Sequence, residues 1–328
     1  MPNGVMIVAE TAEGSLAPIS AELSGVGRAL ADELGQTLTA VLFGSGIGGL
    51  GEELAALGAD RVLLADDDAL SEYQGDAYLA VLERIVREQA PEILLLGQTP
   101  NLRELAARLA FRLETGLTTD CTSLRLEDGV LVMTKPVFGG SAIAEYVVDD
   151  ARPQMATIRP RAFEPATPQA SRQAEVQPVA VSLDGVVRTR VLETVKEAAT
   201  SGPRLKDAKT VVSGGRGLGG PENWKYVEEL AETLGAAVGA TRAVTDAGWV
   251  PASHQVGLTG VTVTPDLYVT VGVSGAVQHI AGCSGARNIV AINKDPDANI
   301  FKHARFGVVG DYKQVVPALT EAIKALRG

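Results

Sequence analysis

The 328-residue sequence has little cysteine, few aromatic residues and no long apolar run. Its two cysteines, Cys121 and Cys283, are too few for a disulfide scaffold or a four-thiolate metal site, so a reducing, cytoplasmic location and no metal centre are expected. The longest purely aliphatic stretch, residues 93–96, is far shorter than the ~20 residues that a membrane helix needs. No basic segment precedes an apolar one near residue 1, and no secretory signal is predicted.

Positive charge is also scarce, because 29 Lys and Arg stand against 40 Asp and Glu and the net charge is -11. A protein this acidic is not expected to bind nucleic acid, which requires a basic surface. The charge is unevenly distributed: residues 1–200 hold 16 basic and 29 acidic side chains, and residues 201–328 hold 13 and 11 with all three histidines. The simpler interpretation is two domains with different surfaces, and the sharper hypothesis is an anionic ligand in the second part.

Hydrophobic patterning predicts a doubly wound α/β domain in residues 1–200. Short, fully apolar strands alternate with stretches of helical spacing, which indicates a parallel sheet covered on both faces. The expected strands are residues 5–9, 38–43, 61–65 and 93–97, and the expected helices cover residues 20–34, 79–82 and 102–109.

The end of this domain has different patterns. Asp128 and Gly129 between two alternating runs predict an antiparallel hairpin appended to the domain. Residues 163–179, with three prolines, are expected to be an irregular connection, and residues 186–196 one more strand. Ser201, Gly202 and Pro203 are the expected linker.

Two features of the first domain resemble ligand sites but are discounted. The glycine-rich turn at residues 44–49 follows a strand but contains no Lys or Arg to hold a phosphate. The acidic run at residues 66–68 also follows a strand and is interpreted as a solvated loop.

Residues 204–328 repeat the strand–helix alternation and predict a second doubly wound α/β domain. The expected strands are residues 210–212, 236–244, 267–273, 289–292 and 307–309, and the expected helices are residues 221–234, 276–282 and 315–326. The first strand leads into a glycine loop in which Gly215, Gly217 and Gly220 satisfy G-x-G-x-x-G. The NAD version of this motif also needs a carboxylate at the end of the next strand, where this sequence has Arg242.

Polar residues follow four strands of this domain. Ligands of open parallel sheets bind beyond the carboxyl ends of the strands. One extended ligand therefore explains the polar clusters at residues 213–220, 274–279, 293–295 and 310–312.

Five ordered motifs in the second domain resemble the α subunit of electron-transfer flavoproteins of bacterial type. They are V-S-G-G-R-G, G-A-T-R-A-V-T-D-A-G, Q-V-G-L-T-G, V-G-V-S-G-A-V-Q-H and A-I-N-K-D, and a weaker match covers residues 152–160. Leu258 departs from the pattern, because glutamine is frequent there, and Thr241 replaces a serine of some members.

The resemblance implies one FAD, held by residues 204–328, and a heterodimer with a β subunit that binds AMP. Residues 1–200, with their acidic surface, are expected to contact this partner, although no motif marks the interface. It implies an electron carrier that is not an enzyme, taking electrons from flavin dehydrogenases such as the acyl-CoA dehydrogenases of fatty acid β-oxidation and passing them to a membrane quinone reductase. The cofactor-binding residues implied are Arg216, Thr241, Arg242, Gln255, Val256, Gly257, Leu258, Thr259, Ser274, Gly275, Ala276, Val277, Gln278, His279, Asn293, Asp311 and Tyr312.

The residue types suit these roles, and each role has an alternative. Thr259 is expected at flavin N5, because a hydroxyl both donates and accepts, or it is an ordinary turn residue. Arg242 is expected near the ring, where at ~4 Å it attracts negative charge by about 4 kcal/mol before desolvation, or it pairs with Asp246. His279 is expected to donate to flavin O2, or it is a packing residue.

Two other functions remain open. One is an NAD-dependent enzyme that uses a similar dinucleotide-binding domain, and the other is a scaffold without redox activity. A visible flavin spectrum distinguishes the flavoprotein from the NAD-dependent enzyme. Arg242→Ala distinguishes it from the scaffold, because only in the flavoprotein is this change expected to lower the semiquinone yield.

Overall fold

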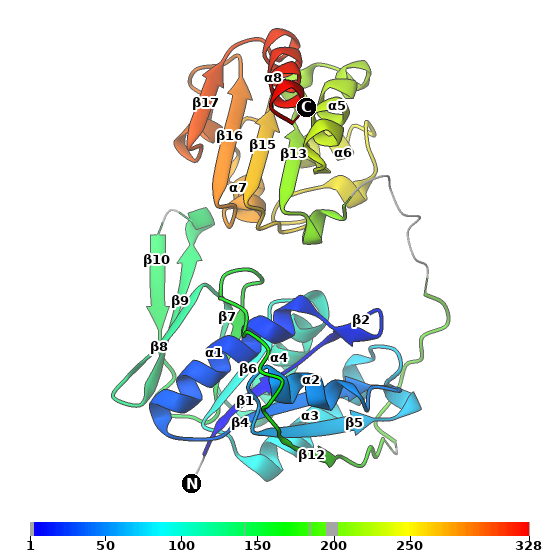
Figure 1. The fold of residues 1–328 in the computed structure, drawn as a ribbon, viewed down its shortest axis with the longest axis vertical. Helices are drawn as coiled ribbons and strands as arrows, with labels where there is room; N and C mark the ends of the chain where they lie inside the picture. The colour runs from blue at the N-terminus through cyan, green and yellow to red at the C-terminus, as the bar shows by residue number, and fades with distance from the viewer. Residues whose placement is uncertain (1–2, 141, 184, 195–202, 328) are drawn as a thin grey trace. The chain divides into compact units, whose positions relative to one another are not determined.

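The computed structural model describes residues 3–140, 142–183, 185–194 and 203–327. The chain divides into two compact units, one made of Met1–Pro136 and Ile143–Val195 and the other of Val137–Ala142 and Lys196–Gly328. Each unit is built around a parallel sheet with helices on both faces, so the predicted fold class is confirmed (Figure 1).

The first unit contains a seven-stranded parallel sheet in its described residues, in the order β12-β5-β4-β1-β6-β11-β7. The strands are β1 (Val5–Val8), β4 (Leu38–Gly44), β5 (Arg61–Asp66), β6 (Ile93–Gly97), β7 (Leu117–Cys121), β11 (Gln154–Ile158) and β12 (Glu175–Pro178). The order reverses between β1 and β6, as in doubly wound sheets. A short hairpin, β2 (Thr11–Ala12) and β3 (Ser15–Leu16), follows β1.

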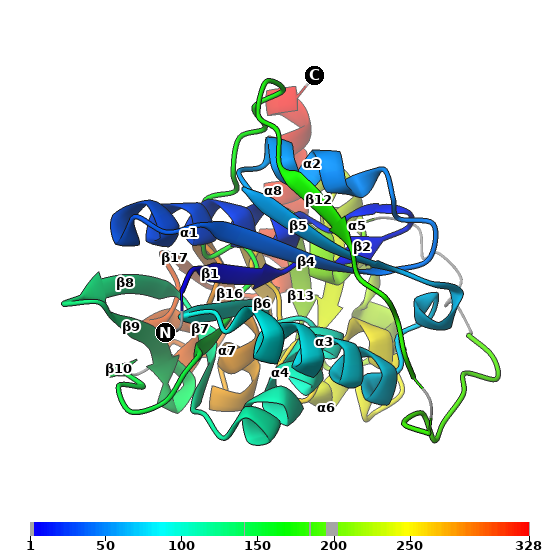
Figure 2. The same ribbon diagram turned by 90° about the horizontal axis from the view of Figure 1, so that it is seen from below.

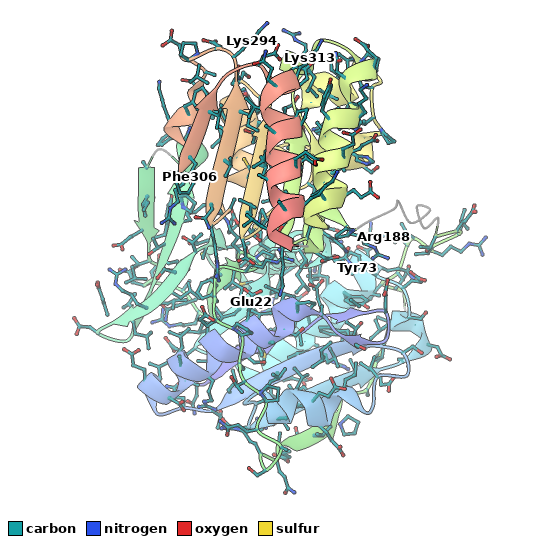
Figure 3. The ribbon with its side chains drawn as sticks, turned by 45° about the horizontal axis from the view of Figure 1, so that its top comes forward. Glu22, Tyr73, Arg188, Lys294, Phe306 and Lys313 are labelled. Atoms are coloured by element: carbon teal, nitrogen blue, oxygen red, sulfur yellow. The ribbon has the colours of Figure 1, made fainter. Side chains whose placement is uncertain are left out.

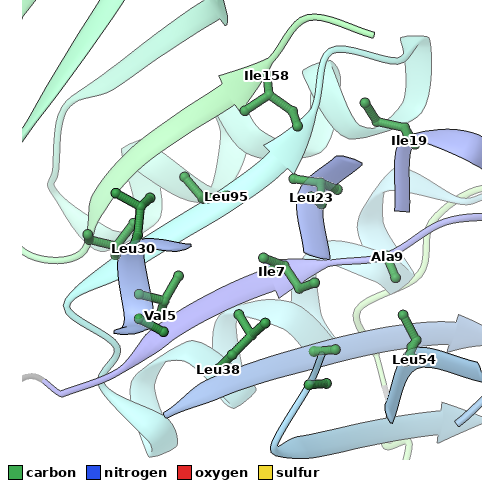
Figure 4. Packing of buried hydrophobic residues seen from close by; sticks show 14 of the residues in the cluster. Val5, Ile7, Ala9, Ile19, Leu23, Leu30, Leu38, Leu54, Leu95 and Ile158 are labelled. Atoms are coloured by element: carbon green, nitrogen blue, oxygen red, sulfur yellow. The ribbon is translucent and has the colours of Figure 1, made fainter. Parts of the chain in front are cut away.

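Helices cover both faces of this sheet (Figure 2). Helices α1 (Pro18–Leu34) and α2 (Leu50–Ala56) pack on one face, and α3 (Gly75–Gln89) and α4 (Pro100–Leu113) on the other. Figure 4 shows Leu23 and Leu30 of α1 over Val5, Ile7 and Leu95 of the sheet, all buried. The fully apolar strands of the sequence are therefore the inner strands, buried from both sides.

The predicted hairpin is present as part of a three-stranded antiparallel sheet of β8 (Ser123–Glu127), β9 (Val130–Val137) and β10 (Ala142–Tyr146). Asp128 and Gly129 both have positive φ, 50° and 80°, which suits a two-residue hairpin turn. The third strand was not predicted.

Two predictions for the end of this unit are wrong. Residues 175–178, placed in the irregular connection, form edge strand β12 beside β5. Residues 186–194 form no strand, and residues 195–196 lie outside the described part. Because β12 already occupies the edge beside β5, residues 186–194 find no strand partner there, although their β-branched pattern favours one.

The second unit contains the sheet β14-β13-β15-β16-β17, parallel throughout. Its strands are β13 (Thr210–Gly214), β14 (Ala237–Ala240), β15 (Leu267–Val271), β16 (Asn288–Asn293) and β17 (Phe306–Val309). Helices α5 (Lys225–Leu234) and α8 (Tyr312–Arg327) pack on one face and α7 (Val277–Cys283) on the other, while the short α6 (Arg242–Thr245) follows β14.

Several boundaries differ from the prediction. Strand β14 ends at Ala240 because the chain turns directly into α6, and Pro221–Asn223 form a 3-10 turn before α5. Among the described residues, no helix is long and apolar enough to cross a membrane. Both cysteines are buried, and burial raises the pKa of the Cys283 thiol to about 12, which keeps it protonated.

Candidate functional site

The residues predicted to bind the cofactor gather at one edge of the second sheet. Arg216 follows β13, Thr241 and Arg242 follow β14, and Asn293 ends β16. Residues 274–279 follow β15, and Asp311 and Tyr312 follow β17. Because all five strands are parallel, their carboxyl ends lie at this edge, which Figure 3 marks with Lys294 and Lys313.

The glycine loop after β13 packs directly on the turn after β15. The Gly217 N–H donates to the Gly272 carbonyl at 3.0 Å, and a Cβ at Gly215 would lie 2.3 Å from that same oxygen. These glycines therefore allow close contact between two turns. Arg216, between them, is exposed.

The turn after β15 leaves backbone donors without acceptors. Gly272 and Gly275 have positive φ, 65° and 81°, and the Ile300 N–H donates to the Ser274 carbonyl at 3.1 Å. Within the described residues, the five N–H groups from Ser274 to Gln278 make no hydrogen bond to the chain. Such a row of amides suits an anion.

The residues after β14 offer a hydroxyl and a cation. The Thr241 Oγ1 atom is buried and, among the described residues, has no hydrogen-bond partner. The Arg242 side chain is 68% exposed and its Nε lies 3.1 Å from Asp246 Oδ2. The ion pair between Arg242 and Asp246, which the sequence offered as the alternative to a place near the ring, is therefore present. Because both side chains are exposed, it contributes little to stability.

The loop of residues 255–260 is held from two sides. The Gln255 amide accepts from Thr245 Oγ1 at 3.1 Å and donates from Nε2 to Thr259 Oγ1 at 2.9 Å. The Leu258 N–H donates to the Gln278 carbonyl at 2.8 Å, while the Leu258 side chain is exposed. Gln255 is thus a support for Thr259, whose hydroxyl proton remains available to another acceptor.

The His279 ring, which is expected to donate to flavin O2, is buried and hydrogen-bonded within the chain. The ring is 6% exposed, Nδ1 lies 3.0 Å from the Val256 carbonyl, and Nε2 lies 3.0 Å from the Tyr268 hydroxyl. Burial lowers the pKa of His279 to about 4, so the ring is neutral at pH 7. Both ring nitrogens are occupied, and donation to a flavin oxygen would require one of these bonds to break.

Three further predicted residues support neighbouring turns. Asn293 donates from Nδ2 to the Val273 carbonyl at 2.8 Å and accepts from the Asp295 N–H. The Tyr312 hydroxyl donates to the Leu218 carbonyl at 2.7 Å, and Asp311 accepts from the Lys313 N–H. Among the described residues, the second oxygen of the exposed Asp311 carboxylate accepts no hydrogen bond.

Known protein families show which family this chain belongs to. The family model of the electron transfer flavoprotein domain matches residues 5–184, and that of the electron transfer flavoprotein FAD-binding domain matches residues 204–284. The chain is 44% identical over 325 residues to the electron transfer flavoprotein subunit alpha of Thermoanaerobacterium thermosaccharolyticum, with 98% of each chain covered. This chain belongs to the electron transfer flavoprotein α-subunit family.

Other members agree with this assignment. Protein FixB of Clostridium saccharobutylicum is 44% identical over 327 residues, covering 99% of this chain and 97% of that protein. The subunit alpha of Bacillus subtilis is 40% identical over 326 residues, with 99% of both chains covered. The family predicted from the five motifs is confirmed, and it is a family of electron carriers rather than catalytic enzymes.

The site of this flavoprotein subunit fits a dinucleotide. The unpartnered amides at residues 274–278 match a pyrophosphate, and the buried Thr241 hydroxyl needs a partner that the described chain does not supply. Arg216 and Arg242 add positive charge at the same edge. At the end of β14, where NAD-binding sheets carry an acid, the chain has Thr241 and Arg242.

Two residues that support the site were not predicted from the sequence. Tyr268 lies in β15 and is fully buried against His279, and Thr245 lies in α6 and binds Gln255. The available signal for Tyr268 was a tyrosine in the predicted inner strand β15, because a buried phenol hydroxyl needs a hydrogen-bond partner.

The discounted features of the first unit have internal roles. Asp66 accepts from the Gly46 and Ile47 N–H groups at 2.7 and 3.1 Å, and Asp68 accepts from Ser45. A carboxylate therefore occupies the amides of the glycine-rich turn, where a phosphate would bind. No group of three metal-ligating side chains occurs among the described residues.

Proposed function

We propose that this chain binds one FAD across the carboxyl edge of its second sheet and, with a β subunit, carries electrons between proteins. The observation that supports this most directly is the row of five unpartnered amides from Ser274 to Gln278, within the segment that the FAD-binding family model covers. Its donors are flavin dehydrogenases such as acyl-CoA dehydrogenases, and its acceptor is a membrane quinone reductase. The place of action is the cytoplasm.

The chain's residues have separate tasks in this proposal. The amides of residues 274–278 bind the pyrophosphate, and the exposed Arg216 guanidinium neutralises its charge. Thr241 donates its buried hydroxyl to the cofactor. Asp311, and the peptide groups that Asn293 holds by hydrogen bonds, bind hydroxyl groups of the adenosine half of the cofactor.

Residues of the 255–260 loop act at the ring. Gln255 directs one N–H to the Thr259 oxygen, so the Thr259 proton points to a ring acceptor, and the Arg242 charge favours electron uptake. FAD, when bound, supplies the one- and two-electron redox chemistry. The backbone of residues 256–258 and 276–279 provides the remaining contacts.

The partner subunit completes the proposal. We assign residues 1–200 to contact with the β subunit, residues 204–328 to the FAD-binding domain, and AMP to the β subunit. Nucleotide released by denaturing the purified β subunit should be AMP, whereas this chain should release FAD and no AMP.

Purification of the chain together with its β subunit tests the function. We expect a yellow complex with one FAD per α subunit, reducible by an acyl-CoA dehydrogenase and its substrate. A colourless complex that binds NAD would instead support the dehydrogenase alternative. A colourless complex that binds neither would support the scaffold.

A further inference from the structure

Tyr268 is the largest side chain that is fully buried among the described residues. It lies in the middle strand β15, between strands β13 and β16. A phenol hydroxyl in such a place costs free energy unless it forms a hydrogen bond. Its bond is to His279 Nε2 at 3.0 Å, and the Ser213 hydroxyl and the Cys283 thiol lie beside it.

The direction of this bond follows from the other side of the ring. His279 Nδ1 faces the Val256 carbonyl at 3.0 Å, and a carbonyl only accepts, so Nδ1 carries the proton. In the neutral ring Nε2 is then an acceptor, and the Tyr268 hydroxyl donates to it. Two hydrogen bonds therefore run in series, from the Tyr268 hydroxyl of β15 to the His279 ring of α7, and from that ring to the Val256 carbonyl of the loop.

This chain of hydrogen bonds ends on the segment that carries Thr259. Val256 is bound by its N–H to the Ala240 carbonyl at 2.9 Å and by its carbonyl to His279. Two residues later, Leu258 is bound to Gln278 of α7. At Gly257 the chain has φ of 150°, and a Cβ at Gly282 would lie 2.4 Å from Gly257, so the loop packs tightly on α7.

We propose that Tyr268 is a positioning residue of the cofactor site: its hydroxyl fixes the His279 ring in the tautomer that binds Val256, and so fixes the 255–260 loop against α7. The inference rests on the proposed function, because the loop and the first turn of α7 are where we place FAD. His279 then links Tyr268 to the loop from inside the protein.

The variant Tyr268→Phe tests this in the full chain purified with its β subunit. It removes one oxygen atom and preserves the ring packing. With histidine labelled by ¹⁵N, the Nε2 signal of His279 should lose the signature of an accepted hydrogen bond, and its Nδ1–H should exchange faster with solvent. The FAD dissociation constant should rise about tenfold, equivalent to about 1.4 kcal/mol.

Tyr78→Phe is the matched control. The Tyr78 hydroxyl donates to the Leu70 carbonyl at 2.9 Å in the first unit, which carries none of the proposed cofactor-binding residues. A purely structural loss should lower the unfolding midpoint in both variants, but only Tyr268→Phe should change FAD affinity and the FAD reduction potential. Equal FAD affinity in the two variants, or an unchanged His279 signal, would overturn the proposal.

A second pair of variants covers the case in which Tyr268→Phe does not fold. His279→Asn keeps an N–H near the position of Nδ1, whereas His279→Leu does not. We expect Asn to retain FAD affinity better than Leu, and equal losses would overturn the proposal. A wild-type complex without FAD would refute the proposed function and this proposal together, whereas an FAD-loaded wild type with an unaffected Tyr268→Phe would refute this proposal alone.

Discussion

Replacing Gly275 with alanine should destabilise the second unit far more than the same change at Gly219. Both glycines have positive φ, 81° at Gly275 and 84° at Gly219, so both substitutions incur the cost of a left-handed alanine, about 1 kcal/mol. The two sites differ in their surroundings. A Cβ at Gly275 would lie 2.2 Å from the Ile300 nitrogen, whereas a Cβ at Gly219 would have nothing within 4 Å.

The overlap at Gly275 sets the expected difference. Its nearest atoms are backbone, with the Ile300 Cα at 2.6 Å, so the chain must move rather than a flexible side chain. Overpacking of this kind costs about 1 to 3 kcal/mol. We therefore expect about 2 to 4 kcal/mol for Gly275→Ala and about 1 kcal/mol for Gly219→Ala.

Urea unfolding monitored by tryptophan fluorescence measures both values. The only two tryptophans of the sequence, Trp224 and Trp249, lie in the second unit, so the signal reports that unit alone. Gly275→Ala should also weaken FAD binding, because it displaces the turn that carries the unpartnered amides. Equal midpoints for the two variants would show that the turn is not packed on Ile300, and the reasoning would fail.

Three further predictions concern charge. The pKa of His279 is about 4 in the folded chain, below the ordinary histidine value of 6.5, so the unfolded chain binds more protons between these values. The contribution of His279 to the free energy of unfolding should therefore fall by about 3 kcal/mol from neutral pH to pH 4. Urea unfolding of the wild type and of His279→Gln measures it as the difference between their pH profiles, and parallel profiles would contradict it. Arg242→Ala should lower the FAD reduction potential by about 20 to 40 mV, because an exposed charge contributes under 1 kcal/mol. Arg287, just before β16, is the control, because its side chain is 70% exposed and pairs with Asp266. A redox titration should show an unchanged potential for Arg287→Ala. Asp66→Ala should leave two amides of the glycine-rich turn without their hydrogen-bond acceptor. Hydrogen exchange at Gly46 and Ile47 should become at least about fivefold faster, the equivalent of about 1 kcal/mol. Unchanged exchange would exclude the role assigned to this carboxylate.

The sequence was sufficient where a signal is local or repeats along the chain. Apolar strands such as residues 93–97 alternate with amphipathic helices, and this determined the class of both units because such strands can be buried only between helical layers. The Asp128–Gly129 turn predicted its hairpin because positive φ at two successive positions demands those residue types. Five motifs in order identified the family.

Pairings between distant residues were decided only by the tertiary structure. Strand β12 has the same local pattern as a loop and becomes a strand because β5 offers an open edge, while residues 186–194 have a strand pattern and no partner strand. The sequence placed His279 at the start of a helix, but only the fold brings its two ring nitrogens to Tyr268 and to the Val256 carbonyl. Composition and spacing can place a side chain at the correct edge of a sheet, but which of its atoms are already bonded depends on groups brought together by folding.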